Sequence, residues 1–211
     1  VDEVDGFLSA YKIGSGDITW LGIVDYIGSK NKPVLLATGA STIDEIELAM
    51  ATLSKRTNDI VLMQCNTNYT GSEDNFRYIN LKVLNTYKEL FPDVVLGLSD
   101  HTPGHSTVLG AVSLGARVIE KHFTDDNDRK GPDHAFSMNY NTWKAMVDDT
   151  RILEKTLGDG IKKIEKNEIK SSLVQKRSIY AINDIKKNQG FKNNIMVLRP
   201  ALKNHLPANR F

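Results

Sequence analysis

A strand–helix unit that repeats five times is the feature that most constrains the fold of this chain. Short apolar runs alternate with segments whose apolar residues follow helical spacing. Such runs, rich in β-branched residues and leucine with little polar alternation, are typical of strands buried on both faces of a sheet. The repeat therefore predicts a parallel sheet with helical crossovers. We expect its strands at Ala10–Ile13, Pro33–Ala37, Ile60–Met63, Val94–Leu98 and Arg117–Ile119.

The segments between these runs carry helix signals. An i, i+3, i+4, i+7 apolar stripe covers Trp20–Ile27. Thr42 and Glu45 form a capping-box pattern that predicts a helix through about Leu53. Further helices are expected at Ile79–Tyr87, Thr107–Leu114 and Trp143–Leu153, the last of them ending at Gly158.

Polar clusters follow all five expected strands and distinguish between two architectures. An open doubly wound sheet needs such residues only near its switch point. In a (β/α)₈ TIM barrel every strand's carboxyl end faces one mouth, which is where the active site lies. We therefore expect a partial TIM barrel formed by about the last five strand–helix units. A complete barrel needs about 250 residues, so about three further units are expected upstream of Val1.

The character of the sequence changes after Gly158. Residues 1–158 are expected to form the C-terminal part of the barrel domain. Residues 159–170 are charged, lack an apolar stripe and indicate a linker. Residues 171–211 contain short apolar runs separated by turns with Asn, Gly and Pro, which predicts the start of a small irregular or β domain.

Composition excludes several functional classes. With a net charge of +1, bulk electrostatics do not favour nucleic acid or a membrane surface as partner. No apolar run reaches the ~18–20 residues that a membrane span requires. Cys65 is the single cysteine, so an intramolecular disulfide is excluded and a reducing, cytoplasmic location is expected.

Two histidines are the candidate metal ligands. His101 directly follows the fourth expected strand, and His122 closes the fifth. Neighbouring strands lie about 4.8 Å apart, so both imidazoles can converge on one ion. Two imidazoles with open coordination positions suit Mn²⁺, Zn²⁺ or Fe²⁺ acting as a Lewis acid. The alternative is two unrelated polar residues at strand ends.

The turn after the first strand, Lys12–Asp17, is a candidate anion site. A lysine at the strand end and two glycines flanking Ser15 would let backbone N–H groups approach a ligand. A plain strand-to-helix turn explains the same residues equally well. Cys65 has no activating partner in the sequence and is interpreted as a small buried residue rather than a nucleophile.

Taken together, five motifs resemble one family. They are Lys12-Ile-Gly-Ser-Gly-Asp17, Ala37-Thr-Gly-Ala-Ser41, Gly97-Leu-Ser-Asp-His-Thr102, Glu120-Lys-His-Phe-Thr124 and Gly131-Pro-Asp-His134. In order and spacing they resemble the N-acetylneuraminate (sialic acid) synthase family, which includes legionaminate and pseudaminate synthases and spore-coat polysaccharide proteins. The tail, with Gln175–Ile179, Asp184–Lys187 and Val197–Pro200, resembles that family's antifreeze-like (SAF) domain.

The resemblance implies a TIM barrel followed by an SAF domain, in a domain-swapped homodimer. It implies condensation of phosphoenolpyruvate with an open-chain, N-acetylmannosamine-like amino sugar, with release of phosphate. The implied cofactor is a divalent metal, with Mn²⁺ expected and Mg²⁺ or Co²⁺ as alternatives.

The resemblance also assigns roles to residues. His101 and His122 match the family's metal ligands, and His122 and Asp17 are the expected catalytic residues, although many members carry Glu at position 17. The expected substrate contacts are Lys12, Ser15, Tyr69 and Ser99 for phosphoenolpyruvate, Thr67 where some members carry Asn, Asp133 for the sugar, and Arg199, which one protomer inserts into the other's site.

The sequence departs from the family at several points. The family's first three strands, which hold a carboxylate, a second lysine and a phosphate-binding threonine, have no counterpart here, and residues 188–191 replace the usual Gly-Glu turn. The isolated chain is therefore expected to be inactive. Two alternatives remain: a metal-dependent pyruvate aldolase on a TIM barrel, and an inactive truncated fragment with a carbohydrate-binding or dimerisation role.

Overall fold

The computed structural model describes residues 1–69, 71–189 and 195–198 of the chain. The chain divides into two compact units, Val1–Gly158 and Asp159–Phe211, which are described separately below. Arg199 lies outside the described residues.

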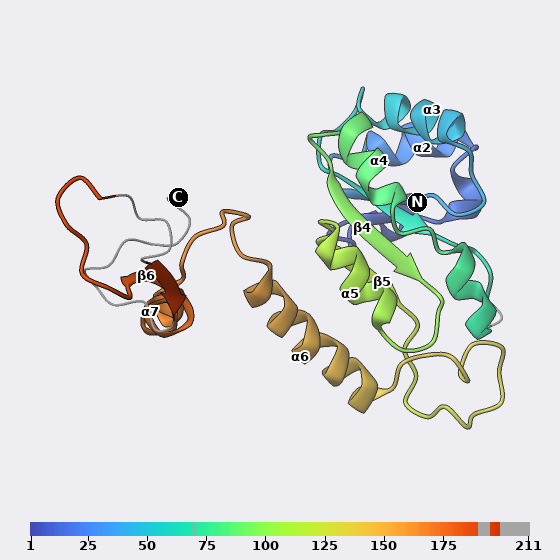
Figure 1. Cartoon of the computed structure of the whole chain (residues 1–211). Coiled ribbons are helices and arrows are strands. Elements are labelled where there is room, and N and C mark those ends of the chain that lie inside the picture. The colour runs from blue at the N-terminus through green and yellow to red at the C-terminus, as the bar shows by residue number, and fades with distance from the viewer. Residues whose placement is uncertain (70, 190–194, 199–211) are drawn as a thin grey trace. The chain divides into compact units, whose positions relative to one another are not determined.

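The first unit, coloured blue to yellow in Figure 1, is built on a parallel sheet of five strands. The strands keep their sequence order from edge to edge. The expected parallel neighbours are thus confirmed. The strands are β1 (Tyr11–Ile13), β2 (Val34–Ala37), β3 (Ile60–Cys65), β4 (Val95–Asp100) and β5 (Val118–Lys121). The last strand extends two residues beyond the apolar run that predicted it, so that His122 follows β5 directly.

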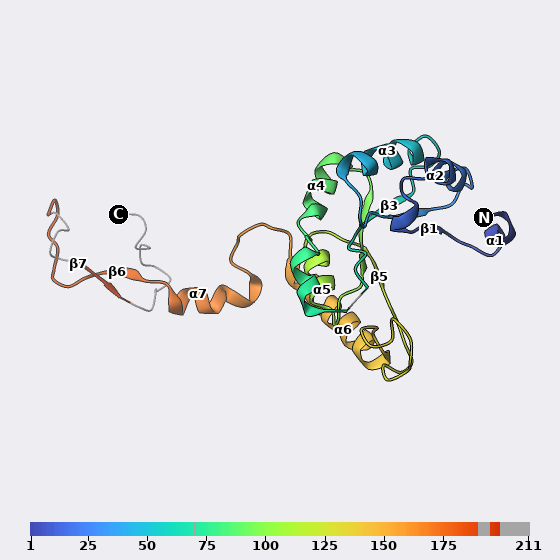
Figure 2. The ribbon, with the colours of Figure 1, turned by 90° about the vertical axis from the view of Figure 1, so that its right-hand side faces the viewer.

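The helices that follow the strands lie along the outer side of the sheet (Figure 2). They are α2 (Leu21–Gly28), α3 (Ile43–Leu53), α4 (Val83–Leu90), α5 (Ser106–Ser113) and α6 (Tyr140–Leu157), with 3₁₀ turns η1 (Ser15–Asp17) and η2 (Glu73–Tyr78); the short α1 (Asp2–Asp5) precedes β1. The predicted capping box at Thr42 is present and starts α3. A second one, at Asn139, starts α6. These caps satisfy backbone N–H groups that lack a partner within the helix.

The sheet is strongly curved. Lys12 Nζ on β1 lies 2.6 Å from Glu120 Oε2 on β5, although these are the two edge strands. In a flat sheet, four strand spacings would separate the edges by about 19 Å. The strands therefore form a half barrel. Its core lies between strands and helices, where Leu36 and Leu62 pack with Leu53 and Leu84 in one fully buried cluster.

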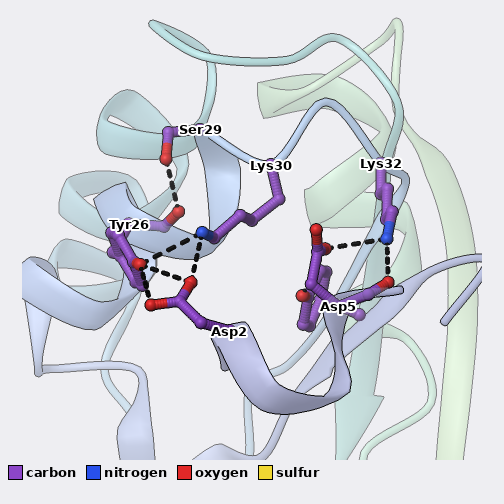
Figure 3. A network of polar contacts seen from close by, with 7 residues as sticks. Asp2, Asp5, Tyr26, Ser29, Lys30 and Lys32 are labelled. Atoms are coloured by element: carbon purple, nitrogen blue, oxygen red, sulfur yellow. Dashed lines mark hydrogen bonds and ion pairs between the residues drawn. The ribbon is translucent and has the colours of Figure 1, made fainter. Parts of the chain in front are cut away.

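The short helix α1 is fixed to the amino-terminal end of the half barrel by two carboxylates (Figure 3). Asp2 accepts hydrogen bonds from Tyr26 Oη at 2.5 Å and from Lys30 Nζ at 2.5 Å. Asp5 accepts from Lys32 Nζ at 2.7 Å and from the Tyr11 hydroxyl at 2.6 Å. The lysine contacts, followed by the tyrosine contacts, lower the pKa of both carboxyl groups. This end of a barrel supports stability, since catalytic groups lie at the opposite end.

The attachment of α1 is expected to depend on pH. The pKa of each carboxyl is lower in the folded than in the unfolded chain, so the stabilisation is complete above the unfolded value and lost as pH falls through the folded one. Tyr26 ring resonances should therefore shift as the pH falls below the ordinary carboxyl value of 3.8. In an Asp2→Asn variant this transition should disappear; an identical transition in both proteins would contradict the assignment.

The second unit contains η3 (Lys166–Glu168), α7 (Ile169–Gln175), β6 (Ser178–Ala181) and β7 (Ile195–Leu198). The two strands pair antiparallel, with Ile179 opposite Val197. The end of the segment expected as a linker is thus part of η3 and of the start of α7. No helix in the described parts of the chain is long and apolar enough to cross a membrane.

Candidate active site

The carboxyl ends of the parallel strands bring most of the sequence-predicted site residues to one mouth of the half barrel. Each residue lies at the carboxyl end of a strand or in the loop that follows it. Lys12 lies on β1, Ser15 and Asp17 in η1, Thr67 and Tyr69 just after β3, Ser99 on β4, His101 and His122 directly after β4 and β5, and Asp133 in the loop before α6. Of the predicted set, Arg199 alone falls outside the described residues.

His101 and His122 face each other at this mouth. Their ring centroids are 5.1 Å apart, with the planes inclined at 67°. The Tyr69 ring packs on both histidines, with centroid distances of 4.0 Å to His101 and 5.7 Å to His122. The structure thus brings together the two residues that the sequence predicted as metal ligands.

The orientation of His101 is fixed by the backbone. Its Nδ1 lies 2.9 Å from the carbonyl oxygen of Asn66, which can only accept, so Nδ1 carries the proton and Nε2 keeps its lone pair. Burial, opposed by this hydrogen bond and reinforced by the charge of His122, lowers the pKa of His101. A neutral imidazole with an available Nε2 is the form that binds metals.

His122 is oriented by the loop that follows β5. Its Nδ1 lies 3.5 Å from Asp133 Oδ2, and the buried Phe136 packs on its ring with a centroid distance of 5.2 Å. The loop is held by its own hydrogen bonds, including Asn127 Nδ2 to the carbonyl oxygens of His134 and Ser137, each at 2.8 Å. A carboxylate beside one imidazole nitrogen is a common arrangement behind metal-binding histidines.

These donors fit a divalent ion. His101 leaves Nε2 available because its Nδ1 is hydrogen-bonded, and His122, whose Nδ1 lies 3.5 Å from a carboxylate oxygen, faces it across the mouth. Within the part of the chain that the structure describes, no group of three or more His, Cys, Asp or Glu side chains is arranged to hold a metal. Two imidazoles would leave the other coordination positions of such an ion to oxygen ligands such as water or substrate.

A cationic and hydroxyl-bearing region lies beside the histidines. The Lys12 ammonium group pairs with Glu120 across the mouth. Ser15 Oγ accepts a hydrogen bond from the backbone N–H of Gly39 at 2.9 Å, which links the turns after β1 and β2. A lysine, a serine hydroxyl and exposed turn backbone are groups that bind phosphate or carboxylate.

Gly39 is required by close packing. A Cβ at this position would lie 2.5 Å from Thr67 Cγ2 and 2.9 Å from Ser15 Oγ. We expect Gly39→Ala to lower the free energy of unfolding by about 1–3 kcal/mol, because Thr67 and Ser15 must move. Gly16→Ala is the matched control, since no atom lies within 4 Å of its added Cβ. Equal stability of the two variants in urea unfolding would contradict this prediction.

An open surface hollow of about 570 Å³ lies beside Tyr69. Amide, hydroxyl and phenol groups dominate its lining, which consists of Ala40, Asn66, Thr67, Asn68, Tyr69 and Tyr78. Thr67 and Tyr69, which the resemblance assigns to phosphoenolpyruvate, therefore line a polar hollow. Asp17 is exposed in η1, whereas Ser99 is almost fully buried on β4.

The structure adds Glu120 to the residues at the mouth. The sequence offered a signal for it, because Glu120 lies two residues before His122 and alternate residues of a strand share a face. Cys65 is buried, and burial raises the pKa of its thiol against the lowering effect of Ser15 and Ser99. A thiol in this state is a poor nucleophile.

Comparison with known proteins relates this geometry to a family. Residues 1–162 match the NeuB family. The chain is 39% identical to N,N'-diacetyllegionaminic acid synthase of Campylobacter jejuni subsp. jejuni, an alignment that covers 97% of this chain and 60% of that protein. It is 38% identical to pseudaminic acid synthase of the same organism, covering 93% of this chain and 56% of that protein.

Solved structures show the same relationship. The N-acetylneuraminic acid (sialic acid) synthetase of Leptospira borgpetersenii superposes with a TM-score of 0.71 and 29% identity, over 78% of this chain and 56% of that one. The chain thus spans 60% or less of the length of these relatives.

Proposed function

The chain belongs to the NeuB family, and from this membership we propose that the whole protein is a nonulosonic-acid synthase that condenses phosphoenolpyruvate with an N-acetylated amino sugar. The names of its relatives support a sugar-acid synthase. The observation that carries the proposal is the pair His101 and His122 beside Lys12 and Ser15 at one mouth. This arrangement offers a Lewis-acid site next to an anion site.

In the proposed reaction, C3 of phosphoenolpyruvate attacks the aldehyde carbon of the open-chain sugar. The new C–C bond leaves an alkoxide at the former aldehyde oxygen, which takes a proton, and an electron-deficient C2. Water adds to C2 and loses a proton. The resulting tetrahedral carbon then expels phosphate by cleavage of its C–O bond, which gives the 2-keto acid.

The residues of the mouth have distinct roles in this scheme. Lys12 and Ser15 bind the anionic end of phosphoenolpyruvate and hold its C3 toward the sugar. His101 and His122 would hold Mn²⁺, which supplies Lewis-acid polarisation of the aldehyde. Asp133 orients His122 and, with the exposed Asp17, faces the sugar's hydroxyl groups. Ser99, Thr67 and Tyr69 complete the walls of the phosphoenolpyruvate site.

The experiment is a phosphate-release assay on the full-length protein with Mn²⁺. Release should require both phosphoenolpyruvate and an N-acetylated hexosamine. With ¹⁸O in the bridging C–O–P position, the label should appear in phosphate, because the C–O bond breaks. Equal use of pyruvate would instead favour the aldolase, and sugar binding without turnover would favour a non-catalytic protein.

We also propose that residues 171–211 belong to an SAF domain and that the protein is a domain-swapped homodimer. The support is the resemblance of the tail, in which Arg199 matches an arginine that completes a partner's site; a planar guanidinium suits a carboxylate there. Mixing Arg199→Ala and His122→Ala full-length variants should partly restore activity, because a heterodimer holds one intact site. Heterodimers without restored activity would contradict the exchange.

A further inference from the structure

A buried ion pair lies directly behind the two histidines. Asp100, the last residue of β4, and Lys121, the last residue of β5, are 2.7 Å apart, with side chains 0% and 2% exposed. The other ion pairs among the described residues involve partly exposed side chains, as in Lys12–Glu120. Neither Asp100 nor Lys121 has a part in the proposed chemistry.

Both members of the pair have further hydrogen-bond partners. Asp100 accepts from Thr102 Oγ1 at 2.9 Å, from the Thr102 backbone N–H at 3.1 Å and from Thr107 Oγ1 at 2.6 Å. Lys121 Nζ also donates to the carbonyl oxygen of Thr102 at 2.7 Å. Among the described residues no buried side-chain nitrogen or oxygen lacks a partner. Such a network offsets the cost of removing two charges from water and favours the arrangement in which all its members are paired.

The pair sits at the last rung of the β4–β5 ladder. Asp100 is the register partner of Lys121, and Ser99 that of Glu120. Side chains alternate along a strand, so Asp100 and Lys121 point toward α5, which supplies Thr107, while Glu120 points into the mouth and pairs with Lys12. If β4 or β5 were displaced by one residue along the sheet, the side chains of that strand would exchange faces. Such a displacement would also move His101 and His122 apart, since each follows the pair directly.

We infer that Asp100 and Lys121 are positioning residues whose buried ion pair fixes the register of β4 and β5 and thereby holds His101 and His122 ready to bind one divalent ion. This inference rests on the proposed metal function of the two histidines. A buried ion pair stabilises a fold weakly compared with an apolar pair of equal volume, but it penalises every register that separates the charges. Here the pair aligns His101 and His122, which follow different strands.

The test measures metal binding without turnover. Mn²⁺ dissociation constants are obtained by electron paramagnetic resonance titration of the full-length protein and of an Asp100→Asn/Lys121→Met variant, which removes both charges together and leaves none buried alone. Thermal unfolding is recorded alongside. We expect the double variant to fold and to bind Mn²⁺ at least about tenfold more weakly, the usual effect of losing a group that orients a metal ligand.

Two further variants separate positioning from general stability. Leu53→Ala removes a fully buried side chain on α3 and serves as the control; it should lower the melting temperature yet leave the Mn²⁺ dissociation constant within about threefold. Thr107→Val deletes one hydrogen bond to Asp100 and keeps the side-chain shape, so it provides the measurement if the double variant does not fold; it too should weaken Mn²⁺ binding.

The outcomes distinguish the positioning role of Asp100 and Lys121 from the metal function on which it rests. Wild-type Mn²⁺ affinity in the folded double variant, or in Thr107→Val where the double variant does not fold, overturns the positioning role alone. Equal weakening by Leu53→Ala also overturns it, because stability would then explain the effect. A wild-type protein that binds no Mn²⁺ overturns the metal function, and the positioning role with it.

Discussion

Replacing His122 by alanine is expected to lower the Mn²⁺-stimulated kcat/KM of the full-length protein by at least about 1,000-fold, equivalent to about 4 kcal/mol of transition-state stabilisation. The variant loses one of the two imidazoles that face each other with centroids 5.1 Å apart. It also leaves Asp133 and Phe136 without the ring they contact. A single remaining imidazole would bind a divalent ion weakly and orient it poorly.

The measurement compares phosphate release after chelation and after re-addition of Mn²⁺, together with the Mn²⁺ dissociation constant. His105→Ala is the matched control, because His105 pairs with Asp149 on α6 at 2.9 Å and lies outside the group of rings around Tyr69. The control should keep both affinity and turnover. An active His122→Ala variant that responds to Mn²⁺ like the wild type would remove His122 from the metal site.

The fold could be predicted where it depends on local pattern and not where it depends on distant partners. The apolar runs located all five strands, since a buried parallel strand is apolar throughout. They placed the end of β5 too early, because Lys121 is charged and its burial depends on Asp100, 21 positions away. One error had a local cause: the helix expected from Ile79 begins at Val83, because Asn80 adopts a left-handed φ of 47° that interrupts it.

The candidate site was predictable for a similar reason. Residues that follow parallel strands share one mouth whatever their separation in sequence, so His101 and His122 could be paired in advance. The contacts that orient them could not be. The proton acceptor of His101 is a backbone carbonyl of Asn66, which leaves no trace in residue type. The Lys12–Glu120 contact joins opposite edges of the sheet and exists only because the sheet curves.

The contact between Lys12 and Glu120 suggests a second substitution with a large effect, this time on substrate binding. Replacing Lys12 by methionine should raise the KM for phosphoenolpyruvate by about 10- to 100-fold, the range expected for one lost hydrogen bond to a charged group. The fold should be little affected. Lys12 and Glu120 are 31% and 47% exposed, and an ion pair in such surroundings contributes about 0–1 kcal/mol to stability. Steady-state kinetics and urea unfolding of the full-length protein measure the two quantities.

Glu120→Gln distinguishes a substrate-binding lysine from a structural one. The substitution removes the ion pair as completely as Lys12→Met does but keeps the ammonium group. If Lys12 exchanges Glu120 for phosphoenolpyruvate on binding, Glu120→Gln should leave the KM for phosphoenolpyruvate unchanged or lower it, because a competing anion has been removed. If Lys12 served only to hold Glu120, the two variants would raise KM alike. Parallel behaviour of the pair would therefore contradict the anion-binding role of Lys12, and opposite behaviour would support it.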